Sequence, residues 1–132
     1  MQFSYFVGVD ISKDTLDAAL YPAKDRQKDF LHFDNTKKGL GEMMAWLKTL
    51  GVKRSDLLIC AEYTGVYTNT LIEFADRKGI ALSLNSPLDI KRSIGLVRGK
   101  NDAVDAARIA EFAYRRRENL RLYEKPCDAI MK

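Results

Sequence analysis

Histidine, cysteine and proline are scarce in this 132-residue chain, which contains one, two and three of them. A single histidine, His32, leaves almost nothing for histidine-based metal binding or acid–base catalysis. The two cysteines, Cys60 and Cys127, lack the spacing of a zinc site and do not indicate a disulfide, so we expect reduced thiols. No apolar run approaches the roughly 20 residues that span a bilayer, and the N-terminus lacks a signal-peptide pattern. We therefore expect a soluble, cytoplasmic protein with no membrane partner.

The charge of the chain is unevenly distributed. Residues 1–85 contain 11 Lys/Arg and 11 Asp/Glu, whereas residues 86–132 contain 11 against 7, so the C-terminal third carries the whole net charge of +4. A clustered basic excess fits a polyanionic partner, although a solvated helix face gives the same count more often. The length, with 46% hydrophobic residues, is enough for one domain with a real core.

The apolar pattern predicts an α/β fold. Strands are expected at residues 3–9, 15–21, 29–33, 57–61 and 80–84, and helices at residues 37–50, 67–78 and 102–117. The first three strands are joined by turns so short that they must be antiparallel neighbours, whereas the helices between later strands imply parallel crossovers. The most economical order places the fourth strand beside the first. The prediction is a mixed five-stranded sheet with an antiparallel three-strand meander, flanking helices and a central first strand that is buried on both faces.

Two of these strands lead into an acid. Asp10 follows the first strand and Glu62 the fourth, so their carboxylates should meet at one edge of the sheet, where ligands bind in open α/β sheets. The last helix adds Asp102 and Asp105, which share a stripe with the apolar Ile109. Four carboxylates in one pocket would repel one another unless cations lay between them, and two Mg²⁺ ions about 4 Å apart would form the clamp used in phosphoryl transfer. Taken singly, each acid could instead be a helix cap, a turn residue or the partner of a lysine.

Four segments, in their order along the chain, resemble the N-terminal domain of the DEDD transposases of bacterial insertion sequences. They are Val7–Lys13, Glu62–Tyr67, Asn85–Pro87 and Lys100–Arg108. This group has a RuvC-like, ribonuclease H-type fold and includes the pilin-gene invertases and the bridge-RNA-guided recombinases. The resemblance covers roughly Phe3 to Arg121, and Asn101 departs from it, because the family often has Thr or Ser there.

Matched position by position, the acidic residues of the family fall on the four acids named above. This acidic tetrad consists of Asp10, Glu62, Asp102 and Asp105. The resemblance implies that the tetrad is catalytic and binds Mg²⁺ or Mn²⁺, with two ions expected. Ser12 lies beside the first of these acids, but no base is near it in the sequence, so we interpret it as a turn residue rather than a nucleophile.

The resemblance also implies a domain layout. Residues 1–117 would form the RuvC-like catalytic domain, and residues 118–132 would begin a helical linker or form a disordered tail. Family members carry a further domain after the linker, with a serine that attacks DNA, and we expect that domain to be absent from this chain.

The basic C-terminal third supplies candidates for contacts with nucleic-acid phosphates. They are Lys91, Arg92, Arg98, Lys100, Arg115, Arg116, Arg117 and Arg121. Tyr114 and Tyr123 could stack on bases or pack in the core. The expected partners are DNA, a structured guide RNA as in the guided recombinases, and further copies of the chain in a homo-oligomer.

The first functional hypothesis is the catalytic domain of a metal-dependent transposase or site-specific recombinase, which cleaves and exchanges DNA strands. One alternative is a nucleic-acid-binding and oligomerisation module that is inactive by itself. Another is a stand-alone junction resolvase or nuclease. An ATPase of the sugar-kinase type shares such a sheet, but it ranks last because no glycine-rich phosphate loop follows the first strand.

Overall fold

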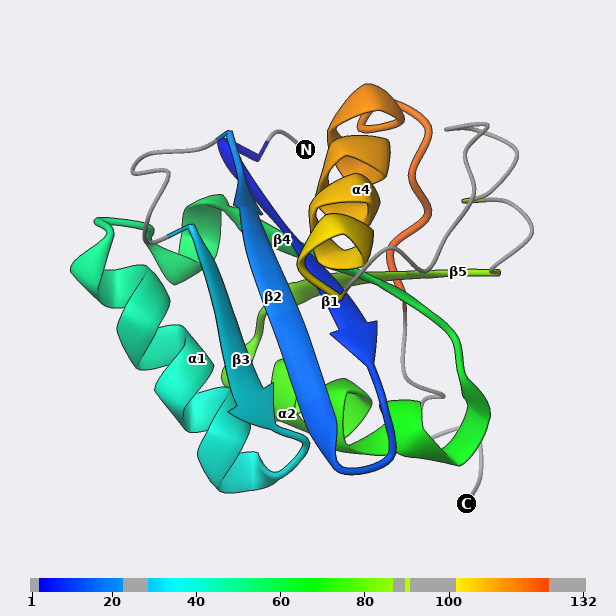
Figure 1. The fold of residues 1–132 in the computed structure, drawn as a ribbon. Coiled ribbons are helices and arrows are strands. Elements are labelled where there is room, and N and C mark those ends of the chain that lie inside the picture. The colour runs from blue at the N-terminus through cyan, green and yellow to red at the C-terminus, as the bar shows by residue number, and fades with distance from the viewer. Residues whose placement is uncertain (1–2, 23–28, 87–89, 91–101, 124–132) are drawn as a thin grey trace, which may run out of the picture.

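A single mixed β-sheet organises the fold (Figure 1). The computed structural model describes residues 3–22, 29–86, 90 and 102–123, with the backbone alone for residues 102–104. The strands in this part are β1 (Tyr5–Ile11), β2 (Thr15–Tyr21), β3 (Phe30–Asp34), β4 (Leu57–Glu62) and β5 (Ala81–Asn85). The helices are α1 (Lys37–Thr49), α2 (Asn69–Lys78) and α4 (Asp102–Arg115), together with the short 3-10 helices η1 (Arg54–Asp56) and η2 (Gly65–Thr68).

The strand order is β3-β2-β1-β4-β5, which confirms the predicted mixed sheet with β4 beside β1. β1 pairs antiparallel with β2 and parallel with β4. Its residues Phe6 to Val9 are buried, as expected for a central strand covered on both faces.

The end of β1 differs from the prediction. The strand was expected to stop at Val9, but it continues to Ile11 because Ile11 still pairs with Leu16 of β2. Asp10 therefore lies within the strand and not after it. Glu62 is likewise the last residue of β4, since it pairs with Asn85 of β5.

Two helical segments are also shorter than expected. The helix predicted from residue 67 begins as η2, and α2 starts only at Asn69. α4 ends at Arg115, two residues earlier than predicted, where the Arg117 N–H donates to Tyr114 O in a tighter turn. α1 begins as expected, with Thr36 as its cap, and α2 ends at Gly79 in the left-handed conformation with φ 69°.

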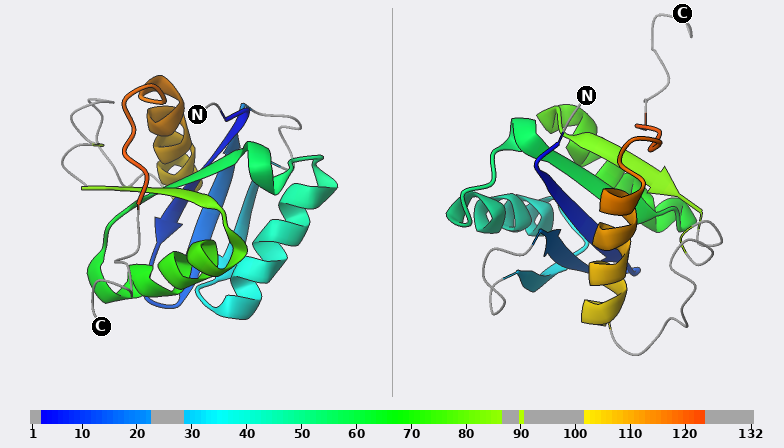
Figure 2. Two further views of the ribbon diagram at one scale, coloured as in Figure 1. Left: turned by 180° about the vertical axis from the view of Figure 1, so that it is seen from behind. Right: turned by 90° about the horizontal axis from the view of Figure 1, so that it is seen from above.

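The helices cover the two faces of the sheet unequally (Figure 2). α1 and α2 lie on one face and pack against the larger apolar core, which includes Val7 and Val9 of β1. α4 lies on the other face and packs against a smaller core that includes Phe6 and Leu58. Since side chains alternate along a strand, Gly8 and Asp10 also face α4.

The segment after α4 adds to this smaller core, because Leu120 and Leu122 pack against it. The Tyr123 N–H then donates to Leu82 O of β5 at 2.6 Å. The division of the chain at residue 117 stays a prediction. Across the described residues, none of the helices has the length and apolar character needed to cross a bilayer.

Candidate functional site

α4 lies directly on the middle of β1. A Cβ atom at Gly8 would fall deep inside the van der Waals radii of two backbone atoms of α4, Ala106 O and Ala110 N, and 3.0 Å from Ala110 Cα. Glycine in a strand allows another backbone to approach this closely. The contact sets the height of α4 above β1, two residues before Asp10.

α4 runs antiparallel to β1, so its first turns lie near the end of that strand (Figure 1). Near the C-terminal end of α4, the Tyr114 ring packs against Phe6 and Tyr21, with ring centroids 5.8 Å and 4.8 Å away. Phe6 is at the beginning of β1, whereas Ala106 lies over Gly8, further along. Tyr114 is therefore a packing residue, which is one of its two expected roles.

Asp105 immediately precedes Ala106 and is buried, with 7% of its surface exposed. The antiparallel course of α4 carries it toward the end of β1 that holds Asp10. Its position on the buried stripe of α4, four residues before the buried Ile109, agrees with the sequence pattern. Asp102 is the first residue of α4, and its side chain lies outside the described part of the structure.

A row of acids crosses the end of the sheet on the face covered by α4. The register pairs Asp10 with Asp17 of β2. β4 lies on the other side of β1, and Glu62 lies one residue beyond Ala61, the last residue of β4 that pairs with β1. Because neighbouring residues of paired strands point to the same face, Asp17, Asp10 and Glu62 form one row, which we call the acid row. Asp17 and Glu62 are only 2% and 4% exposed.

Polar residues lie at both ends of the acid row. His32 of β3 is hydrogen-bonded through Nδ1 to Asp17 Oδ1 at 2.7 Å. Asn85 of β5 pairs in register with Glu62. Its Nδ2 group donates to Ser83 Oγ at 3.1 Å and to Cys60 Sγ at 3.4 Å.

Asp17 is the acid that the sequence pattern did not single out. It lies inside the predicted strand 15–21, between Leu16 and Ala18, and not at the end of that strand. A lone carboxylate inside an otherwise apolar strand is the signal that could have found it, since aspartate is rarely buried without a partner.

The Cys60 thiol lies two residues before Glu62 on the same face. Burial raises its pKa from 9.0 to about 12; the hydrogen bond from Asn85 lowers it, and the charge of Glu62 raises it further. The thiol therefore stays protonated at neutral pH and is not a nucleophile. Cys127 lies outside the described residues.

Hydrogen bonds fix the connections that follow the two strand acids. In the turn after β1, the Ser12 N–H donates to Thr15 O at 2.9 Å, and Ser12 is an exposed turn residue. After β4, the Tyr63 N–H donates to Asn85 O at 2.9 Å. The Thr64 N–H then donates to the Oγ1 atom of the fully buried Thr68, also at 2.9 Å.

The acidic tetrad is thus brought together in part. Asp10, Glu62 and Asp105 lie toward one end of the sheet on one face, although they come from three separate elements. Among the side chains that the structure describes, however, no group of three or more His, Cys, Asp or Glu residues could hold a metal ion. The metal-binding and catalytic roles of the tetrad remain predictions.

The arginines at the end of α4 lie far from the acids. Arg116 is 14 residues beyond Asp102, which corresponds to roughly 20 Å along the helix. Arg115 forms an ion pair with Glu111 at 2.6 Å. The guanidinium groups of Arg116 and Arg117 lie over aromatic rings of α4, 5.6 Å and 4.1 Å from the ring centroids.

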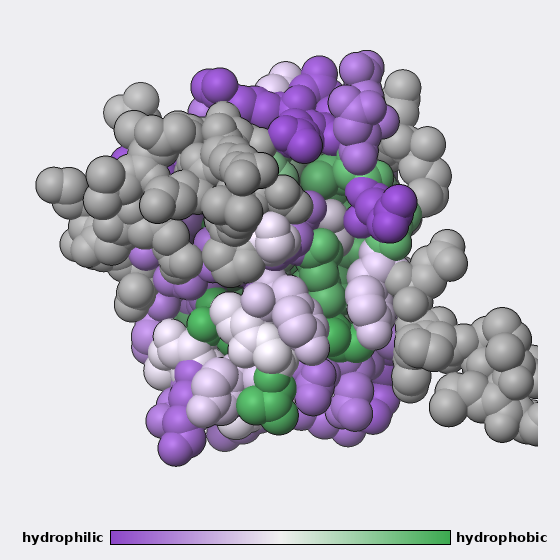
Figure 3. Space-filling view, turned by 90° about the vertical axis from the view of Figure 1, so that its right-hand side faces the viewer, coloured by the Kyte–Doolittle hydropathy of each residue, from purple (hydrophilic) through white to green (hydrophobic). Residues whose placement is uncertain are grey.

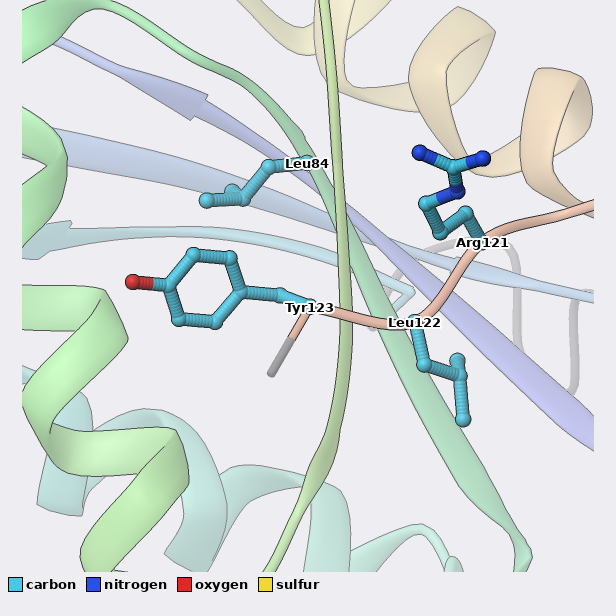
Figure 4. A pocket seen from close by; sticks show the side chains of 4 residues that line it. All are labelled: Leu84, Arg121, Leu122 and Tyr123. Atoms are coloured by element: carbon cyan, nitrogen blue, oxygen red, sulfur yellow. The ribbon is translucent and has the colours of Figure 1, made fainter. Parts of the chain in front are cut away.

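All three arginines are exposed, and hydrophilic residues gather at this end of the molecule in Figure 3. Arg121, also exposed, lines a pocket of about 460 Å³ with Leu84, Leu122 and Tyr123, where the chain crosses β5 (Figure 4). The other predicted phosphate contacts lie outside the described residues. They are Lys91, Arg92, Arg98 and Lys100.

Comparisons with known proteins agree with this architecture. A family model described as a transposase, DEDD_Tnp_IS110, matches residues 7–132. The RuvC structure of Thermus thermophilus superimposes with a TM-score of 0.55 at 11% identity, and covers 90% of this chain and 99% of that chain. T. thermophilus RuvC in complex with a Holliday junction substrate gives a TM-score of 0.56 at 14% identity with the same coverage. A search of curated protein sequences found no match. At these identities the structural likeness shows the fold, which is RuvC-like and of the ribonuclease H type.

Proposed function

Since this chain belongs to the DEDD transposase family of the IS110 type, we propose that its acidic tetrad holds divalent metal ions against a phosphate of the DNA strand that is cut. The family function is DNA cleavage and recombination, and the chain carries the RuvC-like part of such an enzyme.

The observation that supports the proposal is that acids from three separate elements lie toward one end of the sheet on the same face. Glu62 of β4 and Asp105 of α4 are 4% and 7% exposed, and Asp10 lies beside Glu62 in the central strand. Buried carboxylates are costly to desolvate unless cations or donors compensate their charge. Their oxygens are the ligands that Mg²⁺ and Mn²⁺ prefer, so the donor chemistry fits the two ions expected from the family resemblance. When bound, these ions supply Lewis-acid stabilisation of the charge that develops on the phosphate.

The protein's contribution is to fix its carboxylates before any ligand arrives. Asp10 is in a strand paired on both sides, and Glu62 ends a strand that pairs with β5. Asp105 is held at the depth that the contact of α4 with Gly8 sets. Carboxylates on rigid elements lose little freedom on binding, which favours a preorganised site. We include Asp102, the first residue of α4, as the fourth acid.

We propose DNA as the macromolecular partner, held through its phosphates by the basic C-terminal third. The contacts proposed in the described part are Arg115, Arg116, Arg117 and Arg121, and Lys91, Arg92, Arg98 and Lys100 are proposed from the sequence. The structure of RuvC with a Holliday junction supports branched DNA as the substrate class. We also propose that the protein binds a structured guide RNA, forms a homo-oligomer and is located in the cytoplasm.

Nicking of supercoiled and branched DNA in the presence of Mn²⁺ tests the proposed activity. We expect nicking by the wild-type chain and its loss in Glu62→Gln and in Asp105→Asn, because each change removes one carboxylate charge at nearly constant volume. Glu73→Gln is the matched control, since Glu73 is exposed on α2, and it should nick like the wild type. Equal nicking by all four proteins would reject the acidic tetrad as the catalytic group.

A second candidate function is a nucleic-acid-binding and oligomerisation module that does not cut DNA by itself. It is favoured by one observation, namely that Arg115, Arg116 and Arg117 are exposed together at the end of α4 that lies far from the acids. Salt-dependent DNA binding by the wild-type chain without Mn²⁺-dependent nicking would support this candidate over the first.

A further inference from the structure

Asn35 ties together the segments that surround the ends of β1 and β4. Its side-chain Nδ2 group donates to two carbonyl oxygens, Ser12 O at 2.9 Å and Tyr67 O at 3.0 Å. Its backbone N–H donates to Asp14 O at 2.8 Å. One residue therefore bridges the turn between β1 and β2, the start of α1 and the segment η2, all of which lie at the lower edge of Figure 1.

The two segments joined by the Asn35 side chain are the ones that follow the strand acids. Ser12 comes two residues after Asp10, and Tyr67 comes five residues after Glu62. The pairing between β1 and β4 ends at Val9 and Ala61, just before these acids. Along each strand, the carboxylate therefore follows the last residue paired between β1 and β4 and precedes the residue that is hydrogen-bonded to Asn35.

The chemistry of the bridge requires an amide. Both partners are carbonyl oxygens, which need donors, and the NH₂ group of asparagine supplies two. The Asn35 Oδ1 atom is buried and has no hydrogen-bond partner in the described part of the chain. An unsatisfied buried acceptor is unfavourable, so the residue contributes through its donors. Aspartate has almost the same shape but no donor when ionised.

The corner that carries Asn35 is tightly held. The Gly39 N–H donates to Thr36 Oγ1 at 2.9 Å, which caps α1. A Cβ atom on Gly39 would collide with Asp34 O, the last carbonyl of β3. Because α1 packs this closely against the end of β3, the backbone on both sides of Asn35 is held in place.

We propose that Asn35 is a positioning residue for the acidic tetrad, which holds the turn after Asp10 and the loop after Glu62 at a fixed separation. The bridge itself is independent of the proposed function, but its effect on metal affinity rests on that function. Outer residues that orient metal ligands typically affect metal affinity 10-fold to 100-fold.

The test compares Asn35→Asp and Asn35→Ala with Thr36→Ala, which loosens the same corner but keeps both donors of Asn35. In hydrogen exchange followed by mass spectrometry, residues 12–15 and 63–68 should exchange faster in both Asn35 variants than in Thr36→Ala. In calorimetric titrations with Mn²⁺, both Asn35 variants should lose about tenfold in affinity, whereas Thr36→Ala should stay close to the wild type. The nearly isosteric Asn35→Asp decides the matter if Asn35→Ala does not fold.

Unchanged exchange in the two segments would overturn the bridge. Faster exchange with unchanged Mn²⁺ affinity would overturn its positioning role. Failure of the wild type itself to bind Mn²⁺ would count against the proposed function, and the exchange rates would then decide the bridge by themselves.

Discussion

Replacing Gly8 by alanine tests whether α4 is seated on β1 as the structure places it. The added methyl group would collide with Ala106 O and Ala110 N, which are backbone atoms of a helix and cannot move aside singly. α4 would have to lift by about 1 Å to restore a normal separation of ~3.5 Å. Overpacking costs about 1–3 kcal/mol, and we expect about 3 kcal/mol here because the obstacle is backbone. The lower chain entropy of unfolded alanine returns less than about 1 kcal/mol.

Urea denaturation followed by circular dichroism measures this loss. We expect the free energy of unfolding to fall by about 2–3 kcal/mol in Gly8→Ala. Gly41→Ala is the matched control, because a Cβ atom at Gly41 in α1 would have no atom within 4 Å. It should stabilise the protein by up to about 1 kcal/mol, as alanine does in a helix. Equal stability of Gly8→Ala and the wild type would refute the placement of α4.

The same substitution should affect the site. A shift of α4 by about 1 Å would carry Asp105 away from Asp10 and Glu62, and displacements of this size can cost about 100-fold in rate. We therefore expect DNA nicking by Gly8→Ala to fall far below that of Gly41→Ala at a temperature where both are folded. Equal nicking rates would show that the depth of α4 does not matter for the site.

Three further predictions concern the basic end, the buried thiol and the cap of α1. Changing Arg115–Arg117 together to alanine should reduce the slope of log affinity for DNA against log salt concentration by up to about 2.7, or roughly 0.9 per lost phosphate contact; an unchanged slope would exclude these arginines. Because the pKa of Cys60 is raised from 9.0 to about 12, the unfolded chain loses its thiol proton first, so the free energy of unfolding should fall by up to about 1.4 kcal/mol per pH unit from pH 9.0 to about 12. Cys60→Ala should flatten this decline, and an identical decline in both proteins would contradict the assignment. Thr36→Ala should cost about 1 kcal/mol in urea denaturation through loss of the cap, and no loss would mean that Thr36 Oγ1 does not cap α1.

Much of the fold could be predicted because connection length constrains topology. The short links around β2 allow only antiparallel neighbours, and the helices around β4 imply parallel ones, which together place β1 in the centre. The end of β1 could not be read locally, since Ile11 belongs to the strand only through its pairing with Leu16. Strand ends depend on partners that are distant in the sequence.

The residues of the candidate site could likewise be predicted only where local sequence determines their position. Asp10, Glu62 and Asp105 could be singled out because two of them close apolar strand patterns and the third shares a stripe with Ile109, and their metal-binding role stays a prediction. Gly8 and Asn35 could not be singled out in this way, since the structural role of each depends on which backbone segment lies next to it. Thr36 caps α1, whereas the adjacent Asn35 bridges two neighbouring segments, and the sequence does not distinguish these two roles.

Calorimetric titration with Mn²⁺ tests the central claim, that acids from β1, β4 and α4 form one metal site. The account predicts binding by the wild type and at least roughly tenfold weaker binding by Glu62→Gln, since changing even an outer residue that orients a metal ligand typically costs about tenfold or more. Glu73→Gln, which makes the same chemical change at an exposed position of α2, should bind like the wild type. Wild-type affinity in Glu62→Gln, or no binding by the wild type, would contradict the claim.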